Sequence, residues 1–98
     1  MGFTQTMTVR AADGKALTDL MSSWHSAEAG SAPGYIGSRL LADRDDPGRF
    51  MVVVDFSSFE EAEANNARAE TQEWAGRLQA ASQGEPEFGN WDAIHTVG

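Results

Sequence analysis

The chain has 98 residues, no cysteine, and 15 acidic against 7 basic side chains, for a formal net charge of −8. This length allows one domain, residues 1–98, with a thin core. The missing cysteines exclude disulfides, thiolate catalysis and cysteine-ligated metals. Negative charge repels phosphates and anionic lipids, so we expect no nucleic-acid or membrane partner. The N-terminus is polar and no apolar run approaches about 20 residues, so we expect a cytoplasmic protein.

The chain begins with the pattern of a strand followed by a helix. Apolar and polar residues alternate over 3–9, which is typical of a strand with one buried face. An apolar stripe at helical spacing then runs from Leu17 to Trp24. We expect this helix to end near Gly30, at the start of a segment rich in turn-forming residues.

Two strands joined by a tight turn are predicted next. The first covers 35–42, and strict alternation would place Tyr35 and Arg39 on the same face. Residues 43–48 are dense in Asp, Pro and Gly, so the chain should reverse there. The apolar run over 50–56 is therefore expected to pair antiparallel with the preceding strand, as a hairpin.

A second helix and a final strand complete the pattern. Ser57 or Ser58 can cap the helix, because acidic residues follow in its first turn. The helical pattern continues to Gly84, with a kink predicted over 65–68. Alternating residues then predict a last strand over 88–97.

This element order predicts an α+β, ferredoxin-like βαββαβ fold with a four-stranded antiparallel sheet and both helices on one face. The run over 50–54 is apolar at five successive positions, so both faces of that strand require burial. The chain has no second layer for the helix-free side. A second copy of the chain is therefore expected to cover it, which makes the protein a homodimer.

Four segments resemble the dimeric α/β-barrel superfamily and, within it, the antibiotic biosynthesis monooxygenase domain. The resemblance spans nearly the whole chain and is carried by Pro33-Gly34-Tyr35-Ile36-Gly37-Ser38, Asp45-Asp46-Pro47-Gly48-Arg49, Val54-Asp55-Phe56-Ser57-Ser58-Phe59-Glu60-Glu61-Ala62 and Trp91-Asp92-Ala93-Ile94. These motifs serve the fold, so the function that they imply rests on analogy with other members of the family. Known members oxidise polycyclic aromatic phenols without metal or flavin, or open the haem ring.

The haem-opening branch is a poor match. It uses an Asn on the first strand with a Trp and a His along the second helix, whereas this chain has Gln5 on the strand and no histidine in that helix. The resemblance therefore implies a protein without a cofactor. Haem storage or transfer through His25 or His95 is a weaker, third reading.

The phenol-oxidising branch relies on Asn and Trp near the second helix, with Tyr and Arg nearby. The same residue types occur here in similar regions, so the resemblance points to Asn65, Asn66, Trp74, Tyr35 and Arg39 as candidates. Arg39 can equally pair with an acidic residue of a dimer partner.

The helical patterns add Trp24 and His25 and rank the two asparagines. Trp24 lies in the apolar stripe, as core or as pocket wall, and His25 lies about 100° around the helix at the edge of that stripe. Asn66 is expected to face inward beside Ala62, where a buried amide needs a partner or a ligand. Asn65 is expected to face solvent or to cap the kink.

The leading hypothesis is a cofactor-independent monooxygenase acting on a small aromatic quinol or polyphenol between helices and sheet. Asn66 and Trp24 would hold the ring, and His25 or Tyr35 would assist proton transfer. The alternative is a non-catalytic homodimer that binds a small apolar ligand or a protein partner, because every recognised motif serves the fold.

Overall fold

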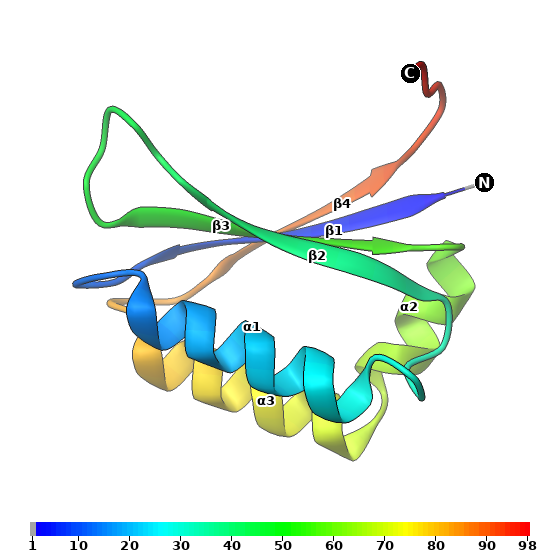
Figure 1. The fold of residues 1–98 in the computed structure, drawn as a ribbon, viewed down its shortest axis with the longest axis horizontal. Helices are drawn as coiled ribbons and strands as arrows, with labels where there is room; N and C mark the ends of the chain where they lie inside the picture. The colour runs from blue at the N-terminus through cyan, green and yellow to red at the C-terminus, as the bar shows by residue number, and fades with distance from the viewer. Residues whose placement is uncertain (1) are drawn as a thin grey trace.

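The computed structural model describes residues 2–98 and has the predicted order of elements, with the second helix divided in two (Figure 1). The elements are β1 (Phe3–Arg10), α1 (Lys15–Glu28), β2 (Tyr35–Ala42), β3 (Arg49–Phe56), α2 (Phe59–Asn66), α3 (Ala69–Ala81) and β4 (Glu87–Asp92). The strands form one antiparallel sheet in the order β2-β3-β1-β4. All three helices lie on one face of it, as Figure 1 shows. The predicted layer arrangement is confirmed.

The core is packed most tightly between α1, α3 and the middle of the sheet. Leu17 of α1, Leu78 of α3 and Val52 of β3 are each at most 1% exposed, and they belong to one apolar cluster. Burying a side chain of this size contributes about 1.5–3 kcal/mol. Because α1 and α3 run side by side (Figure 1), their two apolar stripes close this end of the molecule together.

The predicted hairpin between β2 and β3 is confirmed. Its turn is fastened at Asp43, whose carboxylate accepts a backbone hydrogen bond from Asp45 at 2.9 Å and pairs with Arg49 at 2.9 Å. The backbone hydrogen bond, followed by the Arg49 guanidinium, lowers the pKa of Asp43. Gly48 has φ of 91°, a left-handed conformation that closes the turn at little steric cost because glycine lacks a Cβ.

A β-bulge at the start of β2 overturns the predicted face of Tyr35. Tyr35 pairs with Phe56 and Gly37 pairs with the next residue, Asp55, so one residue of β2 is left over. The extra residue shifts the alternation by one position. Tyr35 therefore faces the helices, whereas Arg39, opposite Val53, lies on the helix-free face. The prediction that these two side chains share a face was wrong.

The second helix is divided where the sequence predicted a kink. α2 is capped by Ser58, whose hydroxyl accepts the backbone N–H of Glu61 at 3.2 Å, as one of the two predicted caps. α2 ends at Asn66 and α3 begins at Ala69. Arg68 between them has extended backbone angles (φ −72°, ψ 140°), which end the first helix and let α3 start in a new direction.

The last strand is shorter than predicted. β4 ends at Asp92, opposite Phe3 at the start of β1, and the strand pairing expected out to Val97 is absent from the described residues. β4 lies at the edge of the sheet and has β1 as its neighbour, so the ladder stops where β1 begins. Ile94 and Val97 are consequently 85% and 80% exposed on a segment that extends away from the helices in Figure 1.

The helix-free face is only partly apolar in a single chain. Val53 is already buried there, at 6% exposed, whereas Leu41 and Trp91 are 42% and 59% exposed. The Trp91 indole N–H donates to the hydroxyl of Thr6 at 3.0 Å, which holds the ring against the sheet. None of the helices described has the length and apolar character needed to span a bilayer.

Replacing Gly34 by alanine should destabilise the fold. Its φ is 65°, and an added Cβ would lie 2.6 Å from the Cβ of Glu61 at the start of α2. A left-handed conformation alone costs a side chain roughly 1–2 kcal/mol, and the clash adds to it. We expect the urea midpoint of Gly34→Ala to fall accordingly. Gly76→Ala is the matched control, because nothing lies within 4 Å of that helical position and alanine should raise stability by roughly 0.5–1 kcal/mol. Equal effects of the two variants would contradict this account of Gly34.

Candidate functional site

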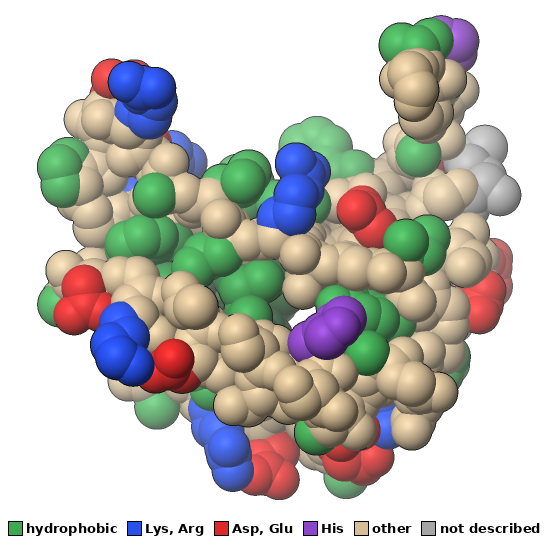
Figure 2. All heavy atoms as spheres, viewed as in Figure 1, with side chains coloured by type: hydrophobic (Ala, Val, Ile, Leu, Met, Phe, Trp, Pro, Cys, Tyr) green, Lys and Arg blue, Asp and Glu red, His purple; other side chains and the backbone are tan. Residues whose placement is uncertain are grey.

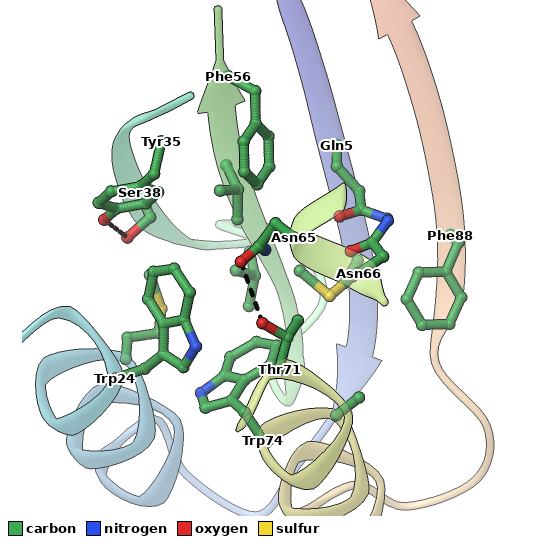
Figure 3. A pocket seen from close by; sticks show the side chains of 15 residues that line it. Gln5, Trp24, Tyr35, Ser38, Phe56, Asn65, Asn66, Thr71, Trp74 and Phe88 are labelled. Atoms are coloured by element: carbon green, nitrogen blue, oxygen red, sulfur yellow. Dashed lines mark hydrogen bonds between the residues drawn. The ribbon is translucent and has the colours of Figure 1, made fainter. Parts of the chain in front are cut away.

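A narrow pocket lies between the helices and the sheet, at the end opposite the packed core (Figure 3). It holds about 560 Å³ free of protein atoms, including the part that opens to solvent. Its wall is built from the second half of α1, the end of α2, the start of α3 and the inward faces of all four strands. Most of the lining is apolar, which is typical of small-molecule sites.

Aromatic rings form one wall of the pocket. The rings of Trp24 and Tyr35 meet edge to face, with centroids 4.9 Å apart and planes at 73°. Phe56 of β3 continues the cluster, 6.3 Å from Tyr35. Trp74 of α3 faces the pocket beside Trp24 in Figure 3, and its indole N–H donates to the backbone oxygen of Leu20 at 3.2 Å. Both tryptophans line the pocket, and for Trp24 this is one of the two placements that its helical stripe allowed. Their role in substrate binding stays a prediction.

The indole nitrogen of Trp24 is different, because it is buried and has no hydrogen-bond partner among the described residues. A buried donor left unpaired costs about 1–3 kcal/mol, and native proteins contain few of them. Trp24 lines the pocket, so an oxygen atom of a bound molecule is a natural partner for this N–H.

The two asparagines exchange the roles that the sequence predicted. Asn65 is 3% exposed, and its side-chain oxygen accepts hydrogen bonds from Thr71 at 3.0 Å and Arg68 at 3.4 Å. Arg68 is held in turn by Glu28 of α1 at 2.7 Å. The buried positions of α2 are Ala62 and Asn65, three residues apart, so the expectation that Asn65 faces solvent was wrong. Both of these hydrogen bonds reach its oxygen, which leaves the two donors of its amide nitrogen for other partners.

Asn66 is exposed, contrary to the prediction that it is buried, yet it lines the pocket as the last residue of α2. In Figure 3 its amide lies beside that of Gln5 from β1, at the end of the pocket near Phe88. Both asparagines therefore belong to the site, Asn65 as a buried wall and Asn66 at the mouth.

Tyr35 connects the pocket to the surface through two hydrogen bonds. Its phenol oxygen lies 3.1 Å from the hydroxyl of Ser38 and 2.9 Å from Nδ1 of His25. Ser38 lines the pocket, whereas His25 is exposed in the last turn of α1. Figure 2 shows a histidine at the surface, at the seam between the helices and the sheet. The sequence offered no signal for Ser38, because strict alternation placed it opposite Tyr35.

The pocket lining contains no carboxylate, lysine, arginine or histidine, and the Tyr35 phenol is its single titratable group. Arg39, a predicted substrate-binding residue, lies outside the pocket on the exposed helix-free side. His95 is exposed beyond the last strand. Residues 2–98 hold no cluster of three or more His, Asp or Glu side chains placed to bind a metal ion.

Comparison with known families identifies the family of this chain. The model of the antibiotic biosynthesis monooxygenase family matches residues 3–77, which covers β1 through most of α3. The chain belongs to the antibiotic biosynthesis monooxygenase family. The match contains the helices and three of the strands that line the pocket, and it confirms the resemblance of the sequence motifs. No curated protein sequence matches the chain.

Solved structures of the family share the fold at low sequence identity. SnoaB of Streptomyces nogalater, a cofactor-independent oxygenase, is 21% identical, with a TM-score of 0.73 over 98% of this chain and 94% of that one. Its asparagine-to-alanine variant gives 19% identity and a TM-score of 0.78, covering 98% and 96% of the two chains. A Methanosarcina mazei protein described only as conserved gives 11% identity and a TM-score of 0.72, covering 93% and 91%. Identities this low establish the shared fold alone.

Removing the amide of Asn65 should cost more stability than removing that of Asn66. In Asn65→Ala the Thr71 hydroxyl and the Arg68 guanidinium lose an acceptor in a buried place, which costs about 1–3 kcal/mol. Asn66→Ala alters an exposed side chain and should change stability by less than about 0.5 kcal/mol. Urea unfolding of the two variants measures the difference. A larger loss for Asn66→Ala would contradict the orientation of α2 described above.

Proposed function

We propose that this protein is a cofactor-independent monooxygenase that oxidises a small aromatic quinol or polyphenol in the pocket. The observation that carries the proposal is the lining itself: aromatic rings and neutral hydrogen-bond donors, with one titratable group, Tyr35. Such a lining suits a flat, uncharged ring that bears oxygen atoms. Membership of the family, and the cofactor-independent oxygenase SnoaB among its structural neighbours, support the reaction type.

The reaction requires little from the protein beyond binding, deprotonation and shielding. A phenol-type substrate that loses a proton becomes an electron-rich anion, which transfers an electron to O₂. Recombination forms a C–O bond, and breaking the O–O bond leaves a carbonyl on the substrate and releases water. In sum, the phenol O–H, the ring C–H at the point of attack and O₂ become two C=O groups of a quinone and H₂O, with the substrate supplying all the electrons. Holding the ring in a water-poor pocket accelerates such steps by orientation and by excluding side reactions.

Each pocket residue has a role that follows from its geometry. Trp24 and Trp74 are positioned to flank the ring. The free indole N–H of Trp24 and the amide nitrogens of Asn65 and Asn66 are positioned to donate to its oxygen atoms. These donors are neutral, so they stabilise the developing anion without adding a permanent charge to the pocket. Tyr35 is placed to receive the proton.

Fluorescence quenching and oxygen uptake with a panel of hydroquinones and polycyclic phenols test the proposal. A bound ring should quench Trp24 and Trp74, which line the pocket, and leave Trp91 unaffected on the other face of the sheet. Trp91→Phe should therefore retain saturable quenching, whereas Trp74→Phe should lose part of it. Asn66→Ala should lower the rate of oxygen uptake by about 10²-fold, as loss of one donor to a developing oxyanion does.

Two results would oppose the assignment in different ways. Saturable quenching without oxygen uptake under air would support the alternative, a binding protein without catalysis. Oxygen uptake that is the same in Asn66→Ala as in the wild type would remove Asn66 from the reaction. Trp91→Phe serves as the matched control for both readouts, since its ring contacts Thr6 and not the pocket.

We also propose that two copies pair through their helix-free faces. Leu41 and Trp91 are exposed on this face, and pairing would bury them. Leu41→Lys should shift sedimentation from dimer toward monomer, because the new charge would have to be desolvated at the interface. Gln72→Lys, an equal change of charge on the exposed side of α3, should leave the dimer intact. A wild-type protein that sediments as a monomer at micromolar concentration would refute the pairing.

A further inference from the structure

Three side chains form a continuous hydrogen-bonded line through the wall that separates the pocket from the surface. Ser38 lines the pocket on one side and a shallow surface groove on the other, and His25 lines that groove. The Tyr35 phenol lies between them, 3.1 Å from the Ser38 hydroxyl and 2.9 Å from Nδ1 of His25. Each member of the line is a group that both donates and accepts hydrogen bonds.

The β-bulge in β2 is what makes this line possible. In a regular strand Tyr35 and Ser38, three residues apart, would point to opposite faces of the sheet. The extra residue between Tyr35 and Gly37 brings both side chains to the helix side. Bulges often redirect side chains next to functional sites, and this one joins a pocket residue to an exposed imidazole.

The pocket lining offers no other proton acceptor. Apart from Tyr35, its polar side chains are amides, hydroxyls and the indoles of two tryptophans, none of which holds an extra proton near neutral pH. An imidazole does accept protons in this range and exchanges them with water. His25 is exposed, so a proton that reaches it leaves to solvent.

The surroundings of His25 allow it to carry a positive charge between the arrival of a proton and its release to solvent. It lies in the last turn of α1, where the backbone carbonyls of a helix end favour a cation. Arg39 is the one other charged residue that lines the same groove, and its positive charge disfavours a positive charge on His25. Glu28, further along α1, is engaged by Arg68. The ring faces of Tyr35 and Trp24 on the inner side are uncharged.

We propose that Ser38, Tyr35 and His25 form a proton relay that carries the substrate's phenolic proton from the pocket to solvent. This inference rests on the proposed function, and it adds Ser38 and a direction of transfer. The substrate O–H bond breaks as its proton passes to the Ser38 oxygen. The Ser38 proton passes to the Tyr35 oxygen, and the Tyr35 proton passes to Nδ1 of His25. His25 then releases its Nε2 proton to water, and exchange with water returns the imidazole to the tautomer with a proton-free Nδ1. Ser38 and Tyr35 are unchanged, and the substrate is left as its anion.

Deprotonation can be measured without oxidation, by rapid mixing with a polycyclic phenol in the absence of oxygen. The phenolate absorption should appear rapidly with the wild type. In Tyr35→Phe, which keeps the ring against Trp24 but removes the hydroxyl, it should appear about 10²-fold more slowly, the usual contribution of a positioned acid–base group. Tyr35 is the chain's single tyrosine, so tyrosine absorbance confirms its removal and reports its state in the wild type.

His25 is tested by substitution and by chemical rescue. The rate of phenolate formation should fall in both His25→Gln and His25→Ala, because neither side chain can take over the proton from Tyr35. His25 is exposed, so free imidazole should restore part of the rate lost in His25→Ala. A merely structural role would not produce this rescue. His95→Ala, at the other histidine of the chain, is the control and should match the wild type.

The outcomes separate the relay from the oxygenase proposal. Fast phenolate formation without later oxygen uptake would support the relay and overturn the proposed oxygenation. Oxygen uptake together with wild-type rates in Tyr35→Phe and His25→Gln would overturn the relay and leave the oxygenation standing. If no phenol in the panel binds the wild type, both proposals are overturned.

Discussion

The structure depends on how the helices cover one face of the sheet. Leu17, Leu78 and Val52 are buried where α1 and α3 present aliphatic side chains that pack against the middle of the sheet. Further along, the same two helices present Trp24 and Trp74, which line the pocket, and Val52 borders it from the sheet. The pocket is a consequence of this change of side chains along two parallel stripes. The stability of the fold and the position of the site therefore have one origin.

Polar groups at the hollow end are organised by the break between α2 and α3. Arg68 at the break ties Glu28 of α1 to Asn65 of α2, and Asn65 also holds Thr71 of α3. The two hydrogen bonds to its side-chain oxygen hold Asn65 in place, and the donors of its amide nitrogen stay available to a bound molecule. The indole N–H of Trp24 on the opposite wall differs from Asn65, because it is a donor without a partner among the described residues. A site with fixed donors and no charge is suited to a neutral ring that becomes an anion only after binding.

The absence of charge from the pocket lining contrasts with the strongly acidic chain. Formal charge of −8 is carried by side chains elsewhere, so the pocket is free of the repulsion that a nearby carboxylate would exert on a phenolate. The same arrangement leaves Tyr35 as the one titratable group of the lining, and the bulge in β2 connects it to the surface. The fold thus forms the pocket, and the bulge in one strand connects the pocket to a surface group that can pass protons to solvent.

The sequence by itself determined the kinds of element, their order, the hairpin and the family, since periodicity, turn residues and caps are local properties. The helical stripe also allowed Trp24 as core or pocket wall, whereas Trp74 became a site candidate through the family resemblance. Only the tertiary structure decided that Tyr35 faces the helices with Ser38, that Asn65 rather than Asn66 is buried, and that β4 stops at Asp92. The reason is the same in each case. A bulge or a helix end shifts a side chain by one position, and a strand ends where its neighbour ends. Both are set by contacts with distant residues and not by the local pattern.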